Sequence, residues 1–176
     1  IFSTSWLFAS LSGRLPKPNM QVALEVYGYS VLLVRDEEGV VHAFQNSCLH
    51  RGTELRCSQE KRGQWSGKVD EEISCPYHGW KYDLSGTLRH IPKKERLLTQ
   101  AGGKLKEFQS TERFGLIWIC FGIPKKTPDQ FFSKLDGRLE KYQLEEMRPV
   151  EARDFEFPVN WKISLENTMD FYHVST

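Results

Sequence analysis

Two short segments of this chain each place one cysteine and one histidine next to glycine, and these segments constrain the fold most. The first reads C-L-H-R-G from Cys48, and the second reads C-P-Y-H-G-W from Cys75. Residues 51–74 separate His50 from Cys75. Thiolate and imidazole both bind transition metals, and the flanking Gly and Pro favour tight turns. The chain must therefore fold so that two distant loops can meet at one site.

This set of ligands fits a [2Fe–2S] cluster in which two histidines replace two cysteines on one iron. Each loop would supply one ligand to each iron, with Cys48 and Cys75 on the inner iron and His50 and His78 on the outer one. Neutral imidazoles raise the potential of the outer iron, which would lie nearest the surface, where an electron can leave. We predict that these four side chains bind the cluster.

A structural zinc site with two cysteines and two histidines, as in a zinc-stapled binding module, is the main alternative. Such sites usually separate paired ligands by about two to four residues, whereas only Leu49 separates Cys48 from His50. Colour distinguishes the two, because a zinc protein is colourless. A further alternative is that the four residues are unrelated core and surface positions.

Composition bounds the remaining possibilities. The 24 Lys and Arg nearly balance the 23 Asp and Glu of this 176-residue chain, which argues against nucleic acid as its main partner. No run approaches the roughly 20 apolar residues needed to span a bilayer, and no export signal is visible, so we expect no membrane association and a cytoplasmic protein. The chain starts at Ile1 without methionine and stops at Thr176, and we interpret it as a fragment.

Alternating apolar residues and turn signals predict mainly β structure in the first two thirds of the chain. The expected strands are residues 21–27, 29–35, 40–44, 72–75, 80–83 and 87–91. The nearly continuous apolar run at 114–121 predicts a strand buried on both faces.

The pattern changes after residue 122. Thr127 as N-cap and Pro128 at the first helical position predict a helix that runs toward Asp136. Residues 151–159 are a further candidate strand, and the apolar spacing from Trp161 predicts a helix that continues to the end. We place a domain boundary near residues 122–127.

Five further residues have no predicted chemistry. His42 and His90 lack cysteine or carboxylate partners at suggestive spacing, and we interpret both as structural. Cys120 is expected in the core. Tyr77 and Trp80 are expected to shield the cluster from water.

The two loops resemble those of the Rieske non-haem iron oxygenases, the terminal (alpha) subunits of ring-hydroxylating dioxygenases and related monooxygenases. Respiratory Rieske proteins typically carry an extra cysteine in each loop, where this chain has Thr53 and Tyr77. The resemblance implies a mainly β Rieske domain of small antiparallel sheets over 1–122, followed by the start of an α+β catalytic domain over 123–176. The separation of the loops is longer than usual, and we expect residues 57–69 to be a polar insertion that leaves the ligands undisturbed.

A second metal site is suggested by Asp170 and His173, which would share one face of a helix. A carboxylate and an imidazole suit a non-haem Fe(II) site, although a hydrogen-bonded surface pair is the alternative. The pattern N-W-K…E-N-x-x-D-x-Y-H is similar to the segment that opens the oxygenase catalytic domain. That resemblance implies that His173 binds the mononuclear iron and that Asp170 is an electron-transfer bridge between His173 and His78 of the partner subunit. The remaining iron ligands would lie beyond Thr176.

The resemblance also implies an activity and its partners. Electrons from NAD(P)H would arrive through a reductase, with or without a ferredoxin, and O2 would be used to hydroxylate or demethylate a small organic substrate. The full-length protein would be a homotrimer or heterohexamer, because only a neighbour's cluster lies close enough to the catalytic iron. The alternative is a Rieske-type ferredoxin-like electron carrier without its own catalytic iron, which would have no use for the segment 161–173.

Overall fold

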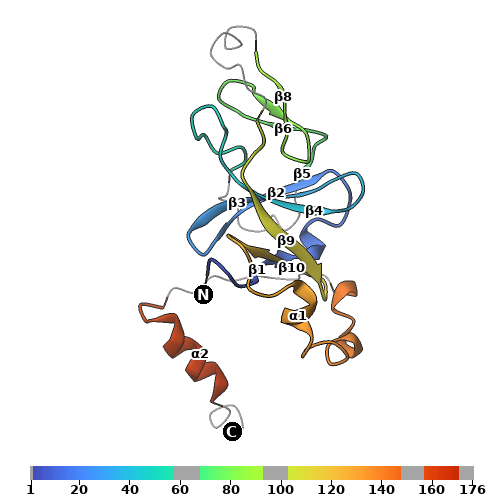
Figure 1. The fold of residues 1–176 in the computed structure, drawn as a ribbon, viewed down its shortest axis with the longest axis vertical. Coiled ribbons are helices and arrows are strands. Elements are labelled where there is room, and N and C mark those ends of the chain that lie inside the picture. The colour runs from blue at the N-terminus through green and yellow to red at the C-terminus, as the bar shows by residue number, and fades with distance from the viewer. Residues whose placement is uncertain (1, 58–67, 93–102, 148–156, 171–176) are drawn as a thin grey trace.

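The computed structural model describes residues 2–57, 68–92, 103–147 and 157–170, and these form two antiparallel sheets (Figure 1). The larger sheet has seven strands in the order β1-β10-β9-β4-β3-β2-β5. Its strands are β1 (Leu7–Leu11), β2 (Met20–Val26), β3 (Tyr29–Arg35), β4 (Val41–Gln45), β5 (Lys68–Val69), β9 (Glu107–Arg113) and β10 (Leu116–Cys120). The smaller sheet consists of β6 (Ile73–Ser74), β7 (Lys81–Tyr82) and β8 (Leu88–His90). The mainly β, antiparallel fold expected from the sequence is confirmed.

The hairpin of β2 and β3 lies toward the β5 edge of the larger sheet. Tyr27 and Gly28 both have positive φ angles, of 50° and 81°, as a two-residue hairpin turn requires, and Val26 pairs with Tyr29. Consecutive residues of β3, such as Leu32 and Leu33, are fully buried, because both faces of the sheet are covered. This explains why β3 reads as a continuous apolar run.

One face of the larger sheet packs against the smaller sheet. Phe44 and Leu32 belong to the same buried cluster as Trp80 and Tyr82. The two layers lie close together at Gly86, whose φ angle is +82° and where an added Cβ would lie 2.7 Å from the Phe44 ring. Glycine is required there both by backbone conformation and by the close packing. This packing fixes the smaller sheet, and with it the second Cys/His loop, on the larger one.

The predicted strand at 114–121 begins at Leu116, because Phe114 and Gly115 have φ angles of 57° and 68° and form the turn between β9 and β10. Burial on both faces is confirmed. Ile117 and Ile119 enter the main core, and the thiol-bearing Cys120 is fully buried beside Trp6 on the opposite face.

The short helix α1 (Pro128–Phe132) begins where the sequence predicts. Thr127 and Gln130 form a capping box, in which the Thr127 hydroxyl accepts from the Gln130 amide and the Gln130 side chain accepts from the Thr127 amide. The helix ends at Phe132 and does not reach Asp136. Phe132 is almost fully buried against Trp6 and Cys120, so the helix ends at the residue that packs into the core. Two 3-10 turns follow, at Glu140–Tyr142 and Leu144–Glu146; another, Ser12–Arg14, follows β1.

The last helix, α2 (Trp161–Met169), also begins as predicted, with the Asn160 side chain accepting from the Lys162 amide. The prediction that it continues to the end is wrong, because Asp170 has φ −81° and ψ 101°, outside the helical region. Residues 157–159 are not in a strand, and the rest of the candidate strand, 151–156, lies outside the described residues. The two α-helices of the described chain have five and nine residues, too few for the roughly 20 needed to cross a membrane.

Candidate metal centre

The two Cys/His loops have the same backbone design. In the first, the Cys48 amide donates to Thr53 O at 2.8 Å, and the Gly52 amide donates to Cys48 O at 2.9 Å. In the second, the Cys75 amide donates to Trp80 O at 2.8 Å, and the Gly79 amide donates to Cys75 O at 3.1 Å. Gly52 and Gly79 both have a φ angle of +72°. Each loop therefore closes on its own cysteine, and the glycine four residues later makes that closure possible.

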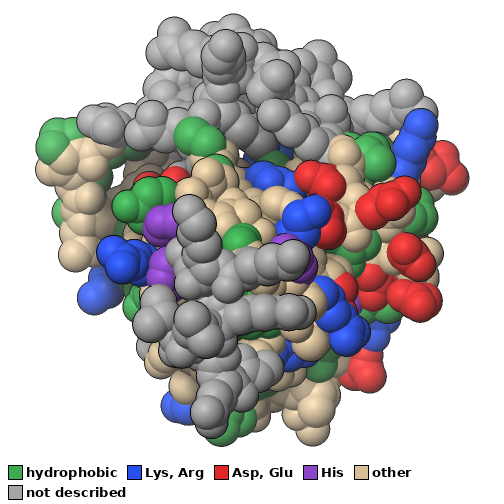
Figure 2. Space-filling view, turned by 90° about the horizontal axis from the view of Figure 1, so that it is seen from above, with side chains coloured by type: hydrophobic (Ala, Val, Ile, Leu, Met, Phe, Trp, Pro, Cys, Tyr) green, Lys and Arg blue, Asp and Glu red, His purple; other side chains and the backbone are tan. Residues whose placement is uncertain are grey.

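The loops bring their ligand candidates together with sulfur inside and imidazole outside. Cys48 and Cys75 are 3% and 4% exposed, and both are free thiols. His50 and His78 are half-buried, and their ring centroids lie 4.9 Å apart. Figure 2 looks down on this end of the molecule and shows histidine side chains at the surface. This polarity is the one that the sequence predicts for a cluster with an inner and an outer iron.

Aromatic side chains surround the histidines. Trp80 is buried and stacks on His50, with 5.0 Å between centroids and 8° between planes. The Tyr77 ring centroid lies 3.8 Å from that of His78, but Tyr77 is 60% exposed. Trp80 is therefore buried against His50, whereas Tyr77 contacts His78 and stays exposed, and shielding of the cluster by the two rings stays a prediction.

Tyr82 adds a contact to the site that the sequence did not reveal. Its hydroxyl lies 3.1 Å from Cys48 Sγ and accepts from the Leu49 amide at 3.1 Å, which leaves the hydroxyl hydrogen to donate to sulfur. Burial raises the pKa of the Cys48 thiol, and the Tyr82 hydrogen bond acts in the opposite direction by stabilising the thiolate. Burial also raises the pKa of the Tyr82 hydroxyl, which keeps it a donor.

The donor set fits a two-iron cluster better than a single zinc ion. Among the residues described, no three Cys, His, Asp or Glu side chains converge as one metal ion would require. A zinc ion needs four such ligands around one point. Each iron of a [2Fe–2S] cluster needs only two protein ligands, because inorganic sulfide fills its other positions. A pair of buried thiols and a separate pair of outward imidazoles meet that requirement.

The second metal site is only partly described. Asp170 is exposed directly after α2, and its amide donates to Glu166 O at 3.1 Å. Because α2 ends at Met169, Asp170 lies outside the helix that the sequence predicted for it. His173 itself lies outside the described residues. Figure 1 shows α2, which Asp170 directly follows, and the β6–β8 sheet at opposite ends of the molecule.

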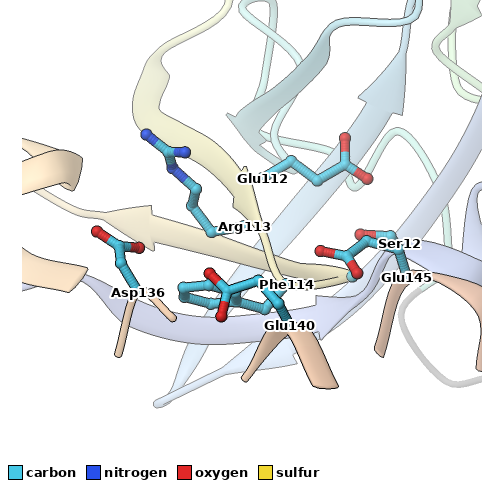
Figure 3. Close-up of a pocket in the computed structure, with 8 residues that line it drawn as sticks. Ser12, Glu112, Arg113, Phe114, Asp136, Glu140 and Glu145 are labelled. Carbon is cyan, nitrogen blue, oxygen red and sulfur yellow. The ribbon is translucent and has the colours of Figure 1, made fainter. Parts of the chain in front are cut away.

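A separate pocket is acidic and lies away from these loops. It has a volume of about 450 Å³, and acidic side chains from β9 and from the segment after α1 gather around Phe114 (Figure 3). Two of its charged residues already have partners outside it. Glu112 forms an ion pair with Arg35 at 2.7 Å, and Arg113 forms one with Asp129.

Comparison with known families identifies the family of this chain. The family model described as the Rieske [2Fe-2S] domain matches residues 5–109. The chain belongs to the Rieske family. A second family model, for the catalytic domain of the ring hydroxylating alpha subunit, matches residues 144–176. The Rieske domain is thus followed by the beginning of an oxygenase catalytic domain, as the sequence predicted.

Similar proteins include oxygenase subunits of known activity. The glycine betaine monooxygenase oxygenase subunit of Chromohalobacter salexigens is 30% identical, over 98% of this chain and 38% of the relative. The carnitine monooxygenase oxygenase subunit of Escherichia coli is 29% identical, over 98% of this chain and 46% of the relative. The quaternary ammonium Rieske monooxygenase CntA, solved with L-carnitine, is 28% identical with a TM-score of 0.81, covering 98% of this chain and 48% of CntA. The Rieske chain therefore spans less than half the length of these relatives.

Proposed function

We propose that this chain forms the Rieske domain and the beginning of the catalytic domain of a terminal oxygenase. In this proposal Cys48 and Cys75 hold the inner iron of a [2Fe–2S] cluster, and His50 and His78 hold the outer one. The supporting observation is the pairing of two buried thiols with two half-buried imidazoles on loops of identical design. When bound, the cluster supplies a one-electron carrier.

The chain's own residues prepare this site for electron exchange at the surface. The buried thiols keep the inner end away from water, and Tyr82 donates a hydrogen bond to Cys48 Sγ. The imidazoles reach the surface, where a reductase or ferredoxin carrying electrons from NAD(P)H would dock. Trp80 holds the His50 ring in one orientation by stacking on it, which limits the motion of that ligand.

Asp170 and His173 belong to the proposed mononuclear iron site. The Asp170 carboxylate would accept hydrogen bonds from His173, an iron ligand, and from His78 of the partner subunit. Two observations support an arrangement across subunits, in a homotrimer or a heterohexamer. Asp170 is exposed and follows α2, which lies at the opposite end of the molecule from the β6–β8 sheet, and a similar structure, of a quaternary ammonium Rieske monooxygenase, gives insights into inter-subunit electron transfer.

The reaction we propose is monooxygenation of a small organic substrate, with quaternary ammonium compounds as the first class to test. Relatives named for glycine betaine and carnitine align over 98% of this chain. A salicylate 5-hydroxylase large oxygenase component also aligns over 98% of this chain. The structure of naphthalene 1,2-dioxygenase matches 73% of this chain, with a TM-score of 0.59. Full-length protein with its reductase should form product from glycine betaine or carnitine. Product from salicylate alone would contradict the proposed class.

Metal and sulfide analysis of the purified chain tests the cluster. We expect a red-brown protein with iron and acid-labile sulfide in equal amounts, about two of each per chain. A colourless protein that contains zinc and no sulfide would overturn the proposal.

The Asp170 bridge is tested in the full-length protein with Asp170→Asn. Both metals should stay bound, while turnover falls by about 10–100-fold, the usual effect of losing a group that orients a metal ligand. Glu166→Gln, which removes a charge one turn earlier on α2, is the matched control and should keep wild-type turnover. Normal turnover in Asp170→Asn would contradict the proposed role of Asp170 as an electron-transfer bridge. A full-length protein that binds the cluster but no second iron would instead favour the electron-carrier alternative.

A further inference from the structure

Behind the cluster loops, polar contacts connect three segments that are distant in sequence. They link the end of the first loop, the start of the second loop and strand β2 of the larger sheet. The residues that make these contacts are Gln21, Asn46, Arg56 and Asp70, which we call the polar bracket. None of them is a predicted metal ligand, so their arrangement needs a separate explanation.

Asn46 closes the first loop. It is 2% exposed and lies two residues before Cys48. Its Oδ1 accepts from the amides of Leu55 and Arg56, both at 3.1 Å. Its Nδ2 donates to Arg56 O at 2.7 Å and to Ser30 Oγ at 3.0 Å. The two ends of the segment 46–56 are therefore held together by one fully bonded, buried amide, as a defined loop geometry requires.

Arg56 connects the first loop to the second. Its Nη2 forms an ion pair with Asp70 Oδ2 at 2.5 Å, and its Nη1 reaches Ser74 O at 3.4 Å. Ser74 directly precedes Cys75, so this side chain reaches from the end of one loop to the residue that begins the other. Arg56 and Asp70 also flank residues 57–69, the predicted insertion, and their ion pair ties the ends of that segment together.

Gln21 anchors the second loop to the larger sheet. It is 2% exposed on β2, and its Nε2 donates to Asp70 O at 2.9 Å and to Glu72 O at 3.0 Å. These carbonyls lie in the short segment that leads into β6 and Cys75. The strands β6 and β7 have two residues each, so their ladder alone provides few bonds to hold this segment.

We infer that Arg56, supported by Asn46, Asp70 and Gln21, is a positioning residue that sets the spacing between the two cluster loops. This inference rests on the proposed function. Each loop would supply one ligand to each iron, so sliding of one loop past the other would displace a thiolate and an imidazole ligand together. The planar guanidinium suits this task, because its several donors in a fixed geometry bond Asp70 and the second loop at once.

The test is Arg56→Gln in the purified chain, followed by the spectrum of the reduced cluster, its midpoint potential and its rate of loss at fixed temperature. We expect a shifted or broadened electron paramagnetic resonance signal, and cluster loss about tenfold faster than in the wild type. About tenfold is the lower end of the effect expected for losing one hydrogen bond to a charged group. Arg89→Gln is the matched control, because Arg89 pairs with Asp83 at 2.6 Å on the same small sheet without joining the loops. This control should match the wild type in all three measurements.

Arg56→Lys separates positioning from the ion pair alone and replaces Arg56→Gln if that variant does not fold. Lysine keeps a charge near Asp70 but lacks the second donor arm, so the altered spectrum and the faster loss should persist in part. Wild-type spectrum and loss rate in Arg56→Lys and in any folded Arg56→Gln would overturn the inference and leave the proposed function intact. Absence of the iron–sulfur signal in the wild type would overturn the proposed function instead.

Discussion

The larger sheet and the smaller sheet of this Rieske domain are stabilised in different ways. In the larger sheet, every strand except the two-residue β5 has five to seven residues, and β3 buries apolar side chains on both faces, with Val31 to Val34 all fully buried. In the smaller sheet, strands of two or three residues carry a loop whose position depends on the polar bracket. Burial of apolar side chains stabilises the fold whether or not a metal is bound, whereas hydrogen bonds, ion pairs and metal–ligand bonds require one particular geometry.

This difference indicates that folding of the larger sheet and placement of the metal ligands depend on different interactions. The larger sheet has a core of its own, distinct from the buried cluster that contains Cys48 and Cys75. The loops share the second core but hold their final geometry through hydrogen bonds and, in our proposal, through the cluster. Because metal binding free energy adds to folding free energy, the small-sheet end should depend on the cluster far more than the large sheet does.

The largest expected effect is loss of the cluster in Cys48→Ser. Iron and sulfide should fall to near zero, and amide hydrogen exchange at Gly52, Cys75 and Gly79 should accelerate, while amides of β2 and β3 stay protected. Hydrogen exchange with mass spectrometry measures both regions in one sample. Cys57→Ser, at an exposed cysteine, is the control and should retain the cluster. An equal increase of hydrogen exchange in both sheets of Cys48→Ser would contradict the claim that the larger sheet folds independently of ligand placement.

The opposite perturbation is Leu33→Ala in the larger sheet. Leu33 is fully buried in the main core, so the substitution should lower the free energy of unfolding by about 2–5 kcal/mol. The spectrum of the folded protein should not change, because no loop contact is altered. Denaturant titration gives the stability, and Val40→Ala, at a residue that is 54% exposed, provides the control. A changed cluster spectrum in Leu33→Ala would show that the two regions are coupled.

A smaller effect is expected at Tyr82→Phe, which removes only the hydroxyl near Cys48 Sγ. Reduction adds negative charge to the cluster, and the hydrogen bond stabilises that charge, so its loss should lower the midpoint potential. About 1 kcal/mol corresponds to roughly 40 mV for a one-electron couple, and we expect a decrease of that order. Protein-film voltammetry measures the shift, with Tyr77→Phe as a control in which only an exposed ring loses its hydroxyl. An unchanged potential in Tyr82→Phe would show that the contact does not act on the cluster.

The smallest effect concerns pH and lies in the larger sheet. Burial lowers the pKa of His42, but hydrogen bonds with Glu107 at 2.9 Å and Asp36 at 2.8 Å outweigh burial, and the net pKa is raised. Protonated His42 therefore stabilises the fold fully below about pH 6.5, and this stabilisation is lost as the pH rises through the raised pKa. We expect less than about 1 kcal/mol, since the pair is partly exposed.

Unfolding free energies of the wild type and of His42→Gln between pH 5 and pH 9 measure this contribution, where the range brackets the ordinary histidine pKa of about 6.5. The difference between the two proteins should be largest at the acidic end. A difference that grows toward alkaline pH would have the wrong sign for a raised pKa and would refute the assignment.

The sequence predicted the features that depend on neighbouring residues. The two loops were found because ligand, turn glycine and spacing lie within five or six residues, and Thr127 identified the start of α1 by a local capping pattern. Strand β9 was not predicted, because only Phe108 of its seven residues is buried and its polar residues resemble a loop. The end of α2 at Met169 was missed since no glycine or proline marks it.

Contacts between distant residues could not be predicted in the same way. Tyr82 reaches Cys48 across 34 positions, and Gln21 reaches Asp70 across 49. His42 was interpreted as a structural residue without carboxylate partners, yet it bonds two carboxylates, one of them 65 positions away. Such pairs are set by strand register and by the packing of one sheet on the other, which a single sequence does not record.

The most direct measurement is pulsed electron paramagnetic resonance of the reduced protein with ¹⁵N-labelled histidine. Our account predicts an iron–sulfur signal with couplings to two histidine nitrogens, and loss of one coupling together with much of the cluster in His78→Ala. An iron–sulfur signal without histidine nitrogen coupling would contradict the assignment of His50 and His78, and so would couplings that survive in full in His78→Ala.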